Sequence, residues 1–347
     1  MNSGKKILIK TAGGKAPKKE LGMGHIYRAI NIAKNLKDQE IFFLVEDFGS
    51  ASKIIKKNNF KNILKIKKNI NQKEDLKITK NFIQKNKIDI LIIDKFNIKN
   101  KFIKNVSEIV KTVVISDLKN FQYYGDLVIN GFIGFSNQIT YNKYGTKCLL
   151  GPKYQILNNK FEKLNKKTTK IFDMLASFGG YDEKNILETF SEEIDRVDGK
   201  IKVKIILGPE TKIMPSILKV KKKYKQNFQV IQKTNDMHNE ISKSRYGICS
   251  GGLIAYEFAA CNVPFGIISQ VKHQLITAKE MEKQKLAVNL GLINNQTSKK
   301  IRGFLEKIEK MPQTNSKNRA IDGKGASRVC KQILRIKYVT ILVKSLG

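Results

Sequence analysis

The sequence has few of the residues that build metal sites and disulfide frameworks. Among its 347 residues are only four cysteines and three histidines. The cysteines show no metal-ligand spacing, so we expect no metal site and free thiols in a reducing cytoplasm. They are Cys148, Cys249, Cys261 and Cys330. No apolar run is long enough to span a bilayer, and the N-terminus passes into a strand pattern without the features of a signal peptide.

Acidic residues are also scarce. The 66 lysines and arginines outnumber the 30 acidic residues and give a formal net charge of +36, which raises the question of nucleic-acid binding. Only seven of the basic residues are arginine, and the lysines are spread along the whole chain without interleaved aromatics. We therefore expect no nucleic-acid partner. A solvated basic surface is the favoured interpretation, with peripheral contact to an anionic membrane surface or an acidic partner as the alternative.

What is present is a regular alternation of strand and helix patterns, typical of doubly wound α/β domains. In the first half, strands are predicted at 5–10, 41–45, 62–65, 88–93, 112–115 and 127–129, with helices at 24–37, 50–58, 74–85 and 99–111. In the second half, strands are predicted at 172–178, 203–207, 228–231, 246–249 and 264–268, with helices at 182–197, 216–224, 237–242, 252–261, 273–285, 299–308 and 326–336. The polar stretch 158–170 divides the chain into predicted domains 1–160 and 161–347. The apolar run 338–343 receives no role.

The stretch LGMGHIYR follows the first strand pattern and opens a helical one. Gly22 and Gly24 would permit a tight turn with close backbone approach. His25 falls in the first helical turn, where free N–H groups and the helix dipole favour an anion. Arg28 lies one turn further, where it could share that anion or orient the histidine. Open α/β sheets place ligands at this end of the first strand. A glycine turn with a capping histidine is the equally weighted alternative.

Two glycine pairs follow strand patterns in the second half. In SGGLIAYE, Gly251 and Gly252 would expose N–H groups at a helix N-terminus and form a diphosphate cradle. Glu257, nearly two turns on, could accept hydrogen bonds from a ribose diol. Gly179 and Gly180 repeat the arrangement after the first strand of this half. An ordinary glycine turn is the alternative, and the spacing is not the dinucleotide fingerprint. Two such loops in one domain favour a nucleotide-phosphate site.

A histidine and glutamine pair follows the next strand and is expected at the same sheet edge. Gln274 could bind sugar hydroxyl or acetamido groups. We interpret His273 as a surface residue at the start of a helix. His238 lies in a polar stretch and is expected only to be solvated.

Together these motifs resemble the UDP-sugar hydrolase of pseudaminic acid biosynthesis, the UDP-2,4-diacetamido-2,4,6-trideoxy-β-L-altropyranose hydrolase family. That family has the GT-B fold, in which two Rossmann-like, doubly wound parallel-sheet domains face each other across a cleft. The resemblance runs nearly end to end, and nine motifs occur in the expected order. They are GMGHIYR (22–28), IIDKFN (92–97), ISDL (115–118), DLVIN (126–130), GPKYQILNNKF (151–161), SFGGYDEKN (177–185), SGGLIAYE (250–257), HQ (273–274) and IDGKGASRV (321–329).

The resemblance implies a metal-independent reaction without a cofactor. UDP would lie in the C-terminal domain and the sugar would face the N-terminal domain. Water would attack the anomeric carbon with inversion, and His25 would act as general base or water-positioning group. The implied substrate contacts are Gly24, Arg28, Asp94, Asn130, Tyr154 and Gln274. The implied UDP contacts are Gly179, Gly180, Gly251, Gly252, Leu253 and Glu257, with the glycine amides stabilising the departing diphosphate.

The chain departs from the family pattern at three places. Residues 10–12 read Lys-Thr-Ala where the family usually has Arg-x-Asp, Leu253 and Ile254 replace a Ser-Thr pair, and Asn158 replaces an arginine. We interpret these departures as changes around the sugar. The glycine-to-glutamate spacing also resembles the GlcNAc transferase that makes lipid II, so a GT-B glycosyltransferase is the alternative function. A basic nucleic-acid-binding protein without catalysis is a distant third.

Overall fold

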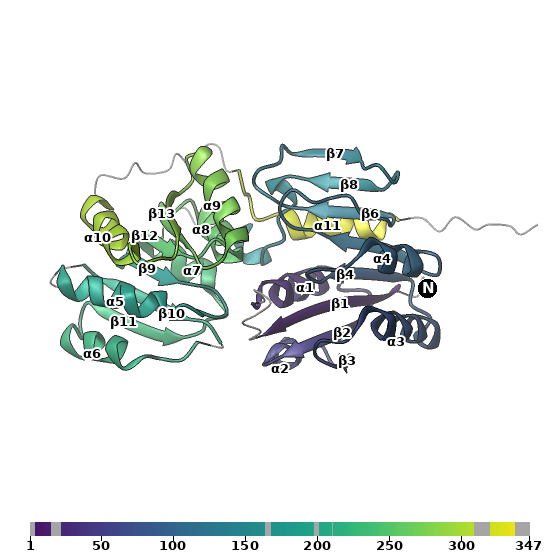
Figure 1. The fold of residues 1–347 in the computed structure, drawn as a ribbon, viewed down its shortest axis with the longest axis horizontal. Coiled ribbons are helices and arrows are strands. Elements are labelled where there is room, and N and C mark those ends of the chain that lie inside the picture. Colours follow the sequence, from purple (N-terminus) through teal and green to yellow (C-terminus); the bar gives the residue numbers. More distant parts are fainter. Residues whose placement is uncertain are drawn as a thin grey trace, which may run out of the picture.

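The protein has two α/β domains, shown beside each other in Figure 1. The computed structural model describes residues 4–14, 22–163, 168–197, 201–209, 211–308 and 320–336. The apolar run 338–343 lies outside these residues.

The N-terminal domain is built on an eight-stranded sheet with the order β3-β2-β1-β4-β5-β6-β8-β7. All neighbouring strands are parallel except the last pair, β7 and β8. The strands are β1 (Lys6–Gly14), β2 (Glu40–Phe48), β3 (Ile63–Ile66), β4 (Ile90–Asp94), β5 (Lys111–Ile115), β6 (Leu127–Asn130), β7 (Gln138–Tyr141) and β8 (Lys147–Leu150). The helices are α1 (Gly24–Asn35), α2 (Ala51–Lys57), α3 (Gln72–Asn86) and α4 (Asn100–Ser107).

Alternating side chains of the central strands supply the two cores of this domain. Ile7 and Ile9 of β1 face the cluster that contains α1 and α2, whereas Leu8 faces the cluster that contains α3 and α4. Both faces of the sheet are therefore covered, which is the reason that β4 is buried along its whole length and apolar up to its last residue, Asp94.

The C-terminal domain has a six-stranded parallel sheet with the order β11-β10-β9-β12-β13-β14. Its strands are β9 (Phe172–Ser177), β10 (Val203–Leu207), β11 (Phe228–Gln232), β12 (Ser244–Cys249), β13 (Phe265–Ser269) and β14 (Val288–Leu292). Its helices are α5 (Ile186–Arg196), α6 (Pro215–Lys223), α7 (Met237–Ser242), α8 (Leu253–Cys261), α9 (Lys272–Lys283) and α10 (Thr297–Lys307). The single turns η2 (Pro152–Tyr154) and η3 (Asn159–Phe161) precede this domain.

Each sheet reverses its strand order at one point. The order reverses between β1 and β4 in the first sheet and between β9 and β12 in the second. Doubly wound sheets bind ligands beyond the carboxyl ends of the strands at such switch points. The predicted motifs around His25, Asp94, Gly179 and Gly251 lie at the end of these four strands or follow them in the sequence.

Every helix and strand predicted within the described residues is present, with shifted ends. Strand β1 extends to Gly14, and the helix predicted at 99–111 ends at Ser107 because Lys111 already pairs in β5. Strands β7, β8 and β14 were not predicted. Strand β7 is largely exposed and β14 is half-buried around a glycine, so neither has the apolar pattern of a core strand.

One helix differs from the predicted division of the chain. Helix α11 (Gly325–Leu334) belongs by sequence to the half 161–347, but it packs against α1 of the N-terminal domain. Its apolar stripe, which includes Val329 and Ile333, joins the same core as β1. Figure 1 shows this helix, in yellow, within the N-terminal domain. A helical pattern identifies such a stripe but does not say which sheet the stripe covers.

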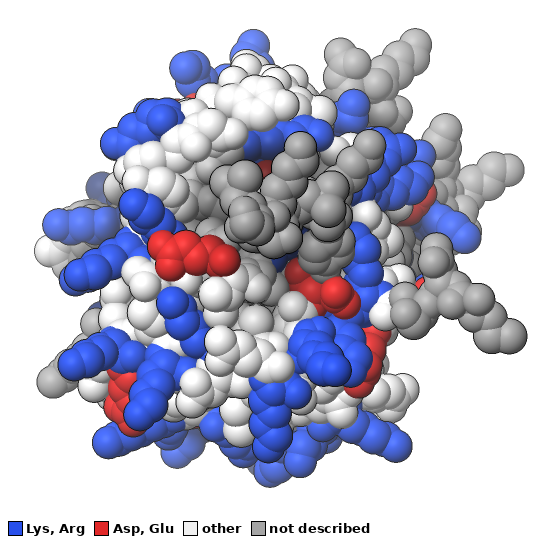
Figure 2. All heavy atoms as spheres, turned by 90° about the vertical axis from the view of Figure 1, so that its right-hand side faces the viewer, with Lys and Arg blue, Asp and Glu red and all other residues white. Residues whose placement is uncertain are grey.

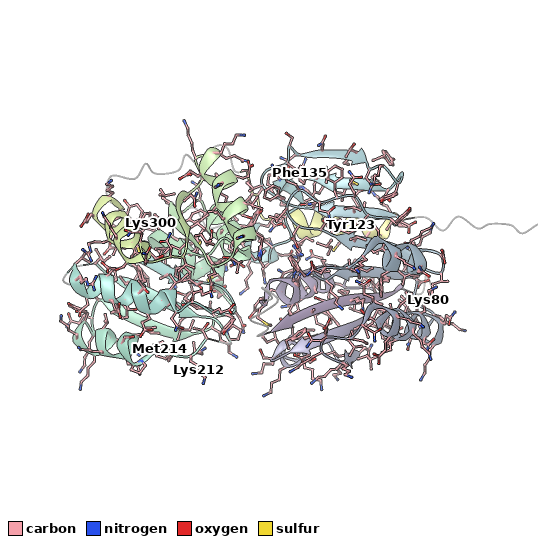
Figure 3. The ribbon with its side chains drawn as sticks, in the orientation of Figure 1. Lys80, Tyr123, Phe135, Lys212, Met214 and Lys300 are labelled. Carbon is pink, nitrogen blue, oxygen red and sulfur yellow. The ribbon has the colours of Figure 1, made fainter. Side chains whose placement is uncertain are left out.

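Basic side chains are spread over the molecule. On the face drawn in Figure 2, lysines and arginines are scattered among uncharged residues and do not gather in one patch. Figure 3 shows Lys80 and Lys300 at opposite ends of the molecule, one in each domain. In the part of the chain that the structure describes, no helix combines the length and apolarity needed to cross a bilayer.

The packing of α11 predicts that alanine substitutions at two adjacent residues have very different effects on the free energy of unfolding. Ile333 is fully buried, whereas Leu334 is 37% exposed. We expect Ile333→Ala to lower the free energy of unfolding by about 2–5 kcal/mol, because it leaves a cavity in the core. Leu334→Ala should change it by less than about 0.5 kcal/mol. Urea unfolding followed by circular dichroism measures both, and equal effects would contradict the packing of α11 on the N-terminal domain.

Candidate functional site

A cavity of about 670 Å³ lies between the carboxyl ends of the two sheets. The N-terminal domain contributes the start of α1 and the loops after β4 and β5. The C-terminal domain contributes both glycine turns and the starts of α8 and α9. The cavity therefore joins the switch points of the two sheets.

His25 is held at this cavity by a buried carboxylate. Its Nδ1 lies 2.6 Å from Oδ1 of Asp94, a fully buried residue at the end of β4. Burial by itself would raise the pKa of Asp94, but the charges of Arg28 and His25 outweigh burial and lower it. Because an ionised carboxylate can only accept, His25 Nδ1 must carry the proton of this bond. In the neutral form of the ring, the other nitrogen, Nε2, is then the proton acceptor.

Arg28 joins two carboxylates and does not reach toward an anion in the cavity. Its Nε and Nη2 donate to Asp94 at 2.7 and 2.5 Å, and its Nη1 and Nη2 donate to Asp117 at 2.6 and 3.1 Å. Burial opposes the charge of Arg28, but the two carboxylates raise its pKa well above the ordinary value. Of the two predicted roles for Arg28, the geometry matches the orientation of His25, because both residues donate to the same oxygen, Oδ1 of Asp94.

Asp117 was not among the predicted site residues. It follows β5, lines the cavity and receives the second pair of bonds from Arg28. Burial would raise the pKa of Asp117, but the guanidinium of Arg28 lowers it to about 2. A polar residue directly after a buried strand, as in the ISDL motif, was the available signal.

Asn130 differs from its predicted role as a substrate contact. It is fully buried behind the cavity, and all its hydrogen bonds stay within the protein. Its Nδ2 donates to the carbonyls of Leu118 and Asn120, both at 2.8 Å, and its Oδ1 accepts from the N–H of Phe132 at 3.0 Å. Asn130 therefore fixes the loop that carries Asp117.

Tyr154 also differs from its predicted role. Only 9% of it is exposed, and its ring packs in the core with β1 and α11. The neighbouring Gln155 lines the cavity in its place. At Gly22 and Gly24, a Cβ would meet no atom of the described residues within 4 Å, so close packing within the protein does not require glycine at either position. Since both glycines line the cavity, their lack of side chains leaves open space there.

The turn at Gly251 and Gly252 has the predicted geometry. Gly252 is the N-cap of α8, and no side chain caps this helix, so its first N–H groups stay available. Gly251 packs so closely against Gln274 that a Cβ would lie 2.5 Å from the Gln274 carbonyl oxygen. The side chain of Gln274 is oriented by the N–H of Gln270, which donates to its Oε1 at 2.9 Å. Leu253 begins the helix and also lines the cavity.

The turn at Gly179 and Gly180 repeats this arrangement only in part. Both glycines line the cavity, and Gly179 has a positive φ of 79° that favours glycine. The predicted helix from Asp182, however, begins only at Ile186. The Asp182 carboxylate accepts from the N–H groups of Ile186 and Leu187 at 3.0 and 2.8 Å. The N-terminus of α5 is thus already capped, and this turn offers only its own amides.

Glu257 lines the cavity from the second turn of α8, as predicted for a ribose contact. Burial raises the pKa of its carboxyl group to about 8. Within the described ranges, no residue forms a hydrogen bond or ion pair with Glu257. A largely protonated carboxyl group can both donate to and accept from a hydroxyl group.

Contrary to expectation, His238 and His273 both line the cavity. Phe96, which follows β4, places its ring centroid 6.4 Å from that of His25 and 5.9 Å from that of His273. His273 therefore lies on the same side of the cavity as His25 and is not merely a surface residue. His238 has its Nδ1 2.8 Å from Oδ1 of Asp236. Sequence reasoning placed His273 at the correct sheet edge but gave no reason for it to point inward.

No metal-binding cluster of three or more histidine, cysteine or acidic side chains occurs among the described residues. The metal-independent chemistry stays a prediction.

The arginine bridge predicts a characteristic response to acid. The lowered pKa values of Asp94 and Asp117 mean that their charged forms stabilise the fold above about pH 4, and this contribution is lost as the pH falls toward 2. Asp117→Asn should therefore reduce the loss of unfolding free energy between pH 5 and pH 3. The exposed Asp38, just beyond α1, serves as the control through Asp38→Asn. Urea unfolding at both pH values measures the difference. Identical pH dependence in wild type and Asp117→Asn would contradict the role of this bridge.

The two-domain architecture is the GT-B fold, as predicted. MurG of Acinetobacter baumannii superimposes with a TM-score of 0.65 at 14% identity, over 96% of this chain and 100% of that protein. Staphylococcus aureus MnaA, solved with UDP, gives a TM-score of 0.61 at 13% identity, over 95% of this chain and 96% of that protein. These likenesses concern the fold.

Two relatives are similar in sequence. The spore coat polysaccharide biosynthesis protein SpsG of Bacillus subtilis is 27% identical over 283 residues, 79% of this chain and 81% of that protein. The uncharacterized protein MJ1062 of Methanocaldococcus jannaschii is 30% identical over 269 residues, 72% of this chain. The match spans about half of the archaeal protein's length, 54%. No family model matches the sequence.

Proposed function

We propose that this protein is a nucleotide-sugar enzyme that hydrolyses a UDP-linked diacetamido-trideoxyhexose with inversion, without a metal, in nonulosonic acid biosynthesis. The nine sequence motifs, the cavity between the switch points and the pairing of His25 with Asp94 support this proposal. The name of the Bacillus relative and the UDP in the MnaA structure agree with glycan chemistry on a UDP-sugar.

The pairing of His25 with Asp94 carries the proposal. With its proton fixed on Nδ1, His25 can take a proton from water at Nε2 while the water oxygen attacks the anomeric carbon. Asp94 and Arg28 keep the ring in this tautomer and orientation. The bond from the anomeric carbon to the diphosphate oxygen breaks, and UDP leaves with the electron pair. The products are the free sugar with inverted configuration, UDP and one proton.

The C-terminal domain would hold the leaving group. The uncapped N–H groups at the start of α8 face the region where the diphosphate charge increases during departure, and such preorganised donors need little rearrangement. Glu257 would bind the ribose diol, and Gln274 the sugar or the distal phosphate. Leu253 contributes its backbone N–H only.

A GT-B glycosyltransferase is the second candidate, because the His25 and Asp94 pair can deprotonate a sugar hydroxyl as readily as water. The two functions differ in whether turnover requires an acceptor. Slow hydrolysis that accelerates when an acceptor is added would establish the transferase.

Replacement of His25 tests the chemistry. We expect His25→Asn to lower kcat by about 100-fold or more, since it removes the general base, and to leave the Kd of UDP unchanged. An NMR time course with the UDP-linked altropyranose and EDTA follows UDP release and the first anomer formed. Calorimetric titration gives the Kd. Equal losses of UDP binding and turnover would argue against a chemical role for His25.

Replacement of Gly252 tests the phosphate site. A Cβ there would have its nearest neighbours at 3.9 Å, and the backbone angles suit alanine, so Gly252→Ala should leave thermal stability unchanged. The methyl group would stand beside the free N–H groups of α8, and we expect the Kd of UDP to rise about tenfold. Gly303→Ala in α10, also with open space around its Cβ, is the matched control. Unchanged UDP affinity in Gly252→Ala would exclude this turn as the diphosphate site.

A further inference from the structure

The peptide group of Ile133 joins the two domains. This residue follows β6 in the N-terminal domain and is fully buried. Its N–H donates to the hydroxyl of Tyr256 at 3.3 Å, and its carbonyl accepts from Nε2 of Gln284 at 2.6 Å. Both partners belong to the C-terminal domain, Tyr256 on α8 and Gln284 at the C-terminal end of α9. Each of these helices has its N-terminus at the cavity.

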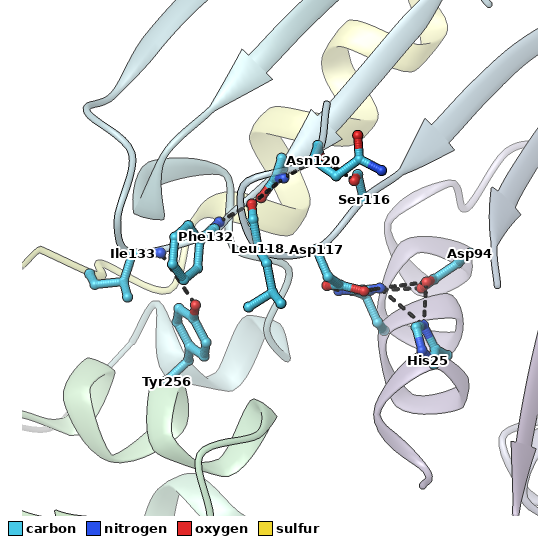
Figure 4. Close-up of polar contacts among 11 residues, drawn as sticks. His25, Asp94, Ser116, Asp117, Leu118, Asn120, Phe132, Ile133 and Tyr256 are labelled. Atoms are coloured by element: carbon cyan, nitrogen blue, oxygen red, sulfur yellow. Dashed lines mark hydrogen bonds and ion pairs between the residues drawn. The ribbon is translucent and has the colours of Figure 1, made fainter. Parts of the chain in front are cut away.

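A series of hydrogen bonds links the segment around Ile133 to His25. The neighbouring Phe132 donates its N–H to Asn130, and Asn130 donates to the carbonyls on either side of Lys119. That loop begins with Asp117, which binds Arg28, and Arg28 shares Asp94 with His25. Figure 4 shows this sequence of contacts from Tyr256 to His25.

Tyr256 also borders the nucleotide side of the cavity. It precedes Glu257 in α8, lines the cavity and is only 6% exposed. Its hydroxyl also interacts with Thr277, which lies one turn after Gln274 on α9. Burial raises the pKa of Tyr256 far above the physiological range, so the hydroxyl stays neutral and keeps its hydrogen. Hydrogen bonds thus connect both α8 and the C-terminal end of α9 directly to the Ile133 peptide.

We propose that Tyr256 is a positioning residue through which the UDP-binding helix α8 sets the orientation of His25. The proposal rests on the function proposed above. It assigns a role in turnover to a hydroxyl group that does not itself act on the reacting atoms. Without the Tyr256 hydroxyl, the buried N–H of Ile133 would have no partner, which costs free energy. The loop that carries Asp117 would then be held less firmly.

Tyr256→Phe removes the hydroxyl group and keeps the ring. We expect kcat to fall about tenfold while the Kd of UDP stays within twofold of wild type. The matched control is Tyr224→Phe, because Tyr224 donates its hydroxyl to Asp195 at 2.8 Å in the same domain but away from the cavity. This control should keep the wild-type kcat. An unchanged kcat in Tyr256→Phe, or a fall of the same size in both variants, would overturn the proposal.

A double-mutant cycle tests whether Tyr256 acts through the contacts that include Asp117 or whether its replacement only disturbs its own surroundings. Residues that act through the same chain of contacts have non-additive effects, whereas distant, independent residues add. Tyr256→Phe combined with Asp117→Asn should therefore lower kcat by less than the product of the two single effects. For Tyr224→Phe combined with Asp117→Asn, the effects of the two substitutions on kcat should multiply. Fully multiplicative effects in both cycles would overturn the proposal.

The His25 imidazole provides a readout that does not require turnover. In protein with 15N-labelled histidine, Tyr256→Phe should shift the ring signals of His25 in the absence of ligand, and Tyr224→Phe should not. If wild type binds UDP but turns over no UDP-sugar, the proposed function fails while such a shift still supports the positioning role. His25 signals that are the same in Tyr256→Phe and wild type would overturn the positioning role, whatever the reaction.

Discussion

The bridge that Arg28 forms between Asp94 and Asp117 is the interaction on which the candidate site depends. Asp94, which is buried, and Asp117, which is partly exposed, come from the ends of neighbouring strands, and their carboxylates would repel each other if they stood alone. The guanidinium satisfies both with paired hydrogen bonds, and the pKa of each carboxyl group falls below its ordinary value. With Asp94 kept ionised, His25 can hold its proton on Nδ1. The tautomer of the histidine therefore follows from the position of an arginine one helical turn away.

This bridge is available because of the sheet topology. The strand order of the first sheet reverses beside β1, so the start of α1 stands directly over the ends of β4 and β5. The six strands of the second sheet follow the same order as the first six positions of the first sheet, and the glycine turns of the second sheet come to the same cavity from the opposite side. A proton acceptor on one domain and uncapped helix N–H groups on the other are complementary requirements for breaking a bond to a charged leaving group.

Sequence patterns predicted most of this arrangement, because buried parallel strands and amphipathic helices have strong periodicity. Sequence patterns did not predict elements or domain contacts that leave no mark on the hydrophobic periodicity. The edge strand β7 is too exposed to have a core pattern, and α11 has an apolar stripe that would fit either domain. At the site, the identity of His25 and the glycine pair at 251 could be found from local spacing. The roles of Asp117 and Asn130 could not, because they depend on contacts of the loop after β5 with Arg28 in α1 and with the end of β6, which are distant in sequence.

The three departures from the resembled family fall into two physical kinds. Lys10 is fully buried on the sheet face opposite α1, where it pairs with Asp75. Burial lowers its pKa to about 8. The same Asp75 binds Lys95, next to Phe96, so this change affects how the loop after β4 is anchored and leaves the cavity wall intact. Leu253, Ile254 and Asn158, by contrast, line the cavity itself. A difference in the ligand should therefore be sought at these three residues, where two apolar side chains and a neutral amide stand in place of two hydroxyl groups and a cation.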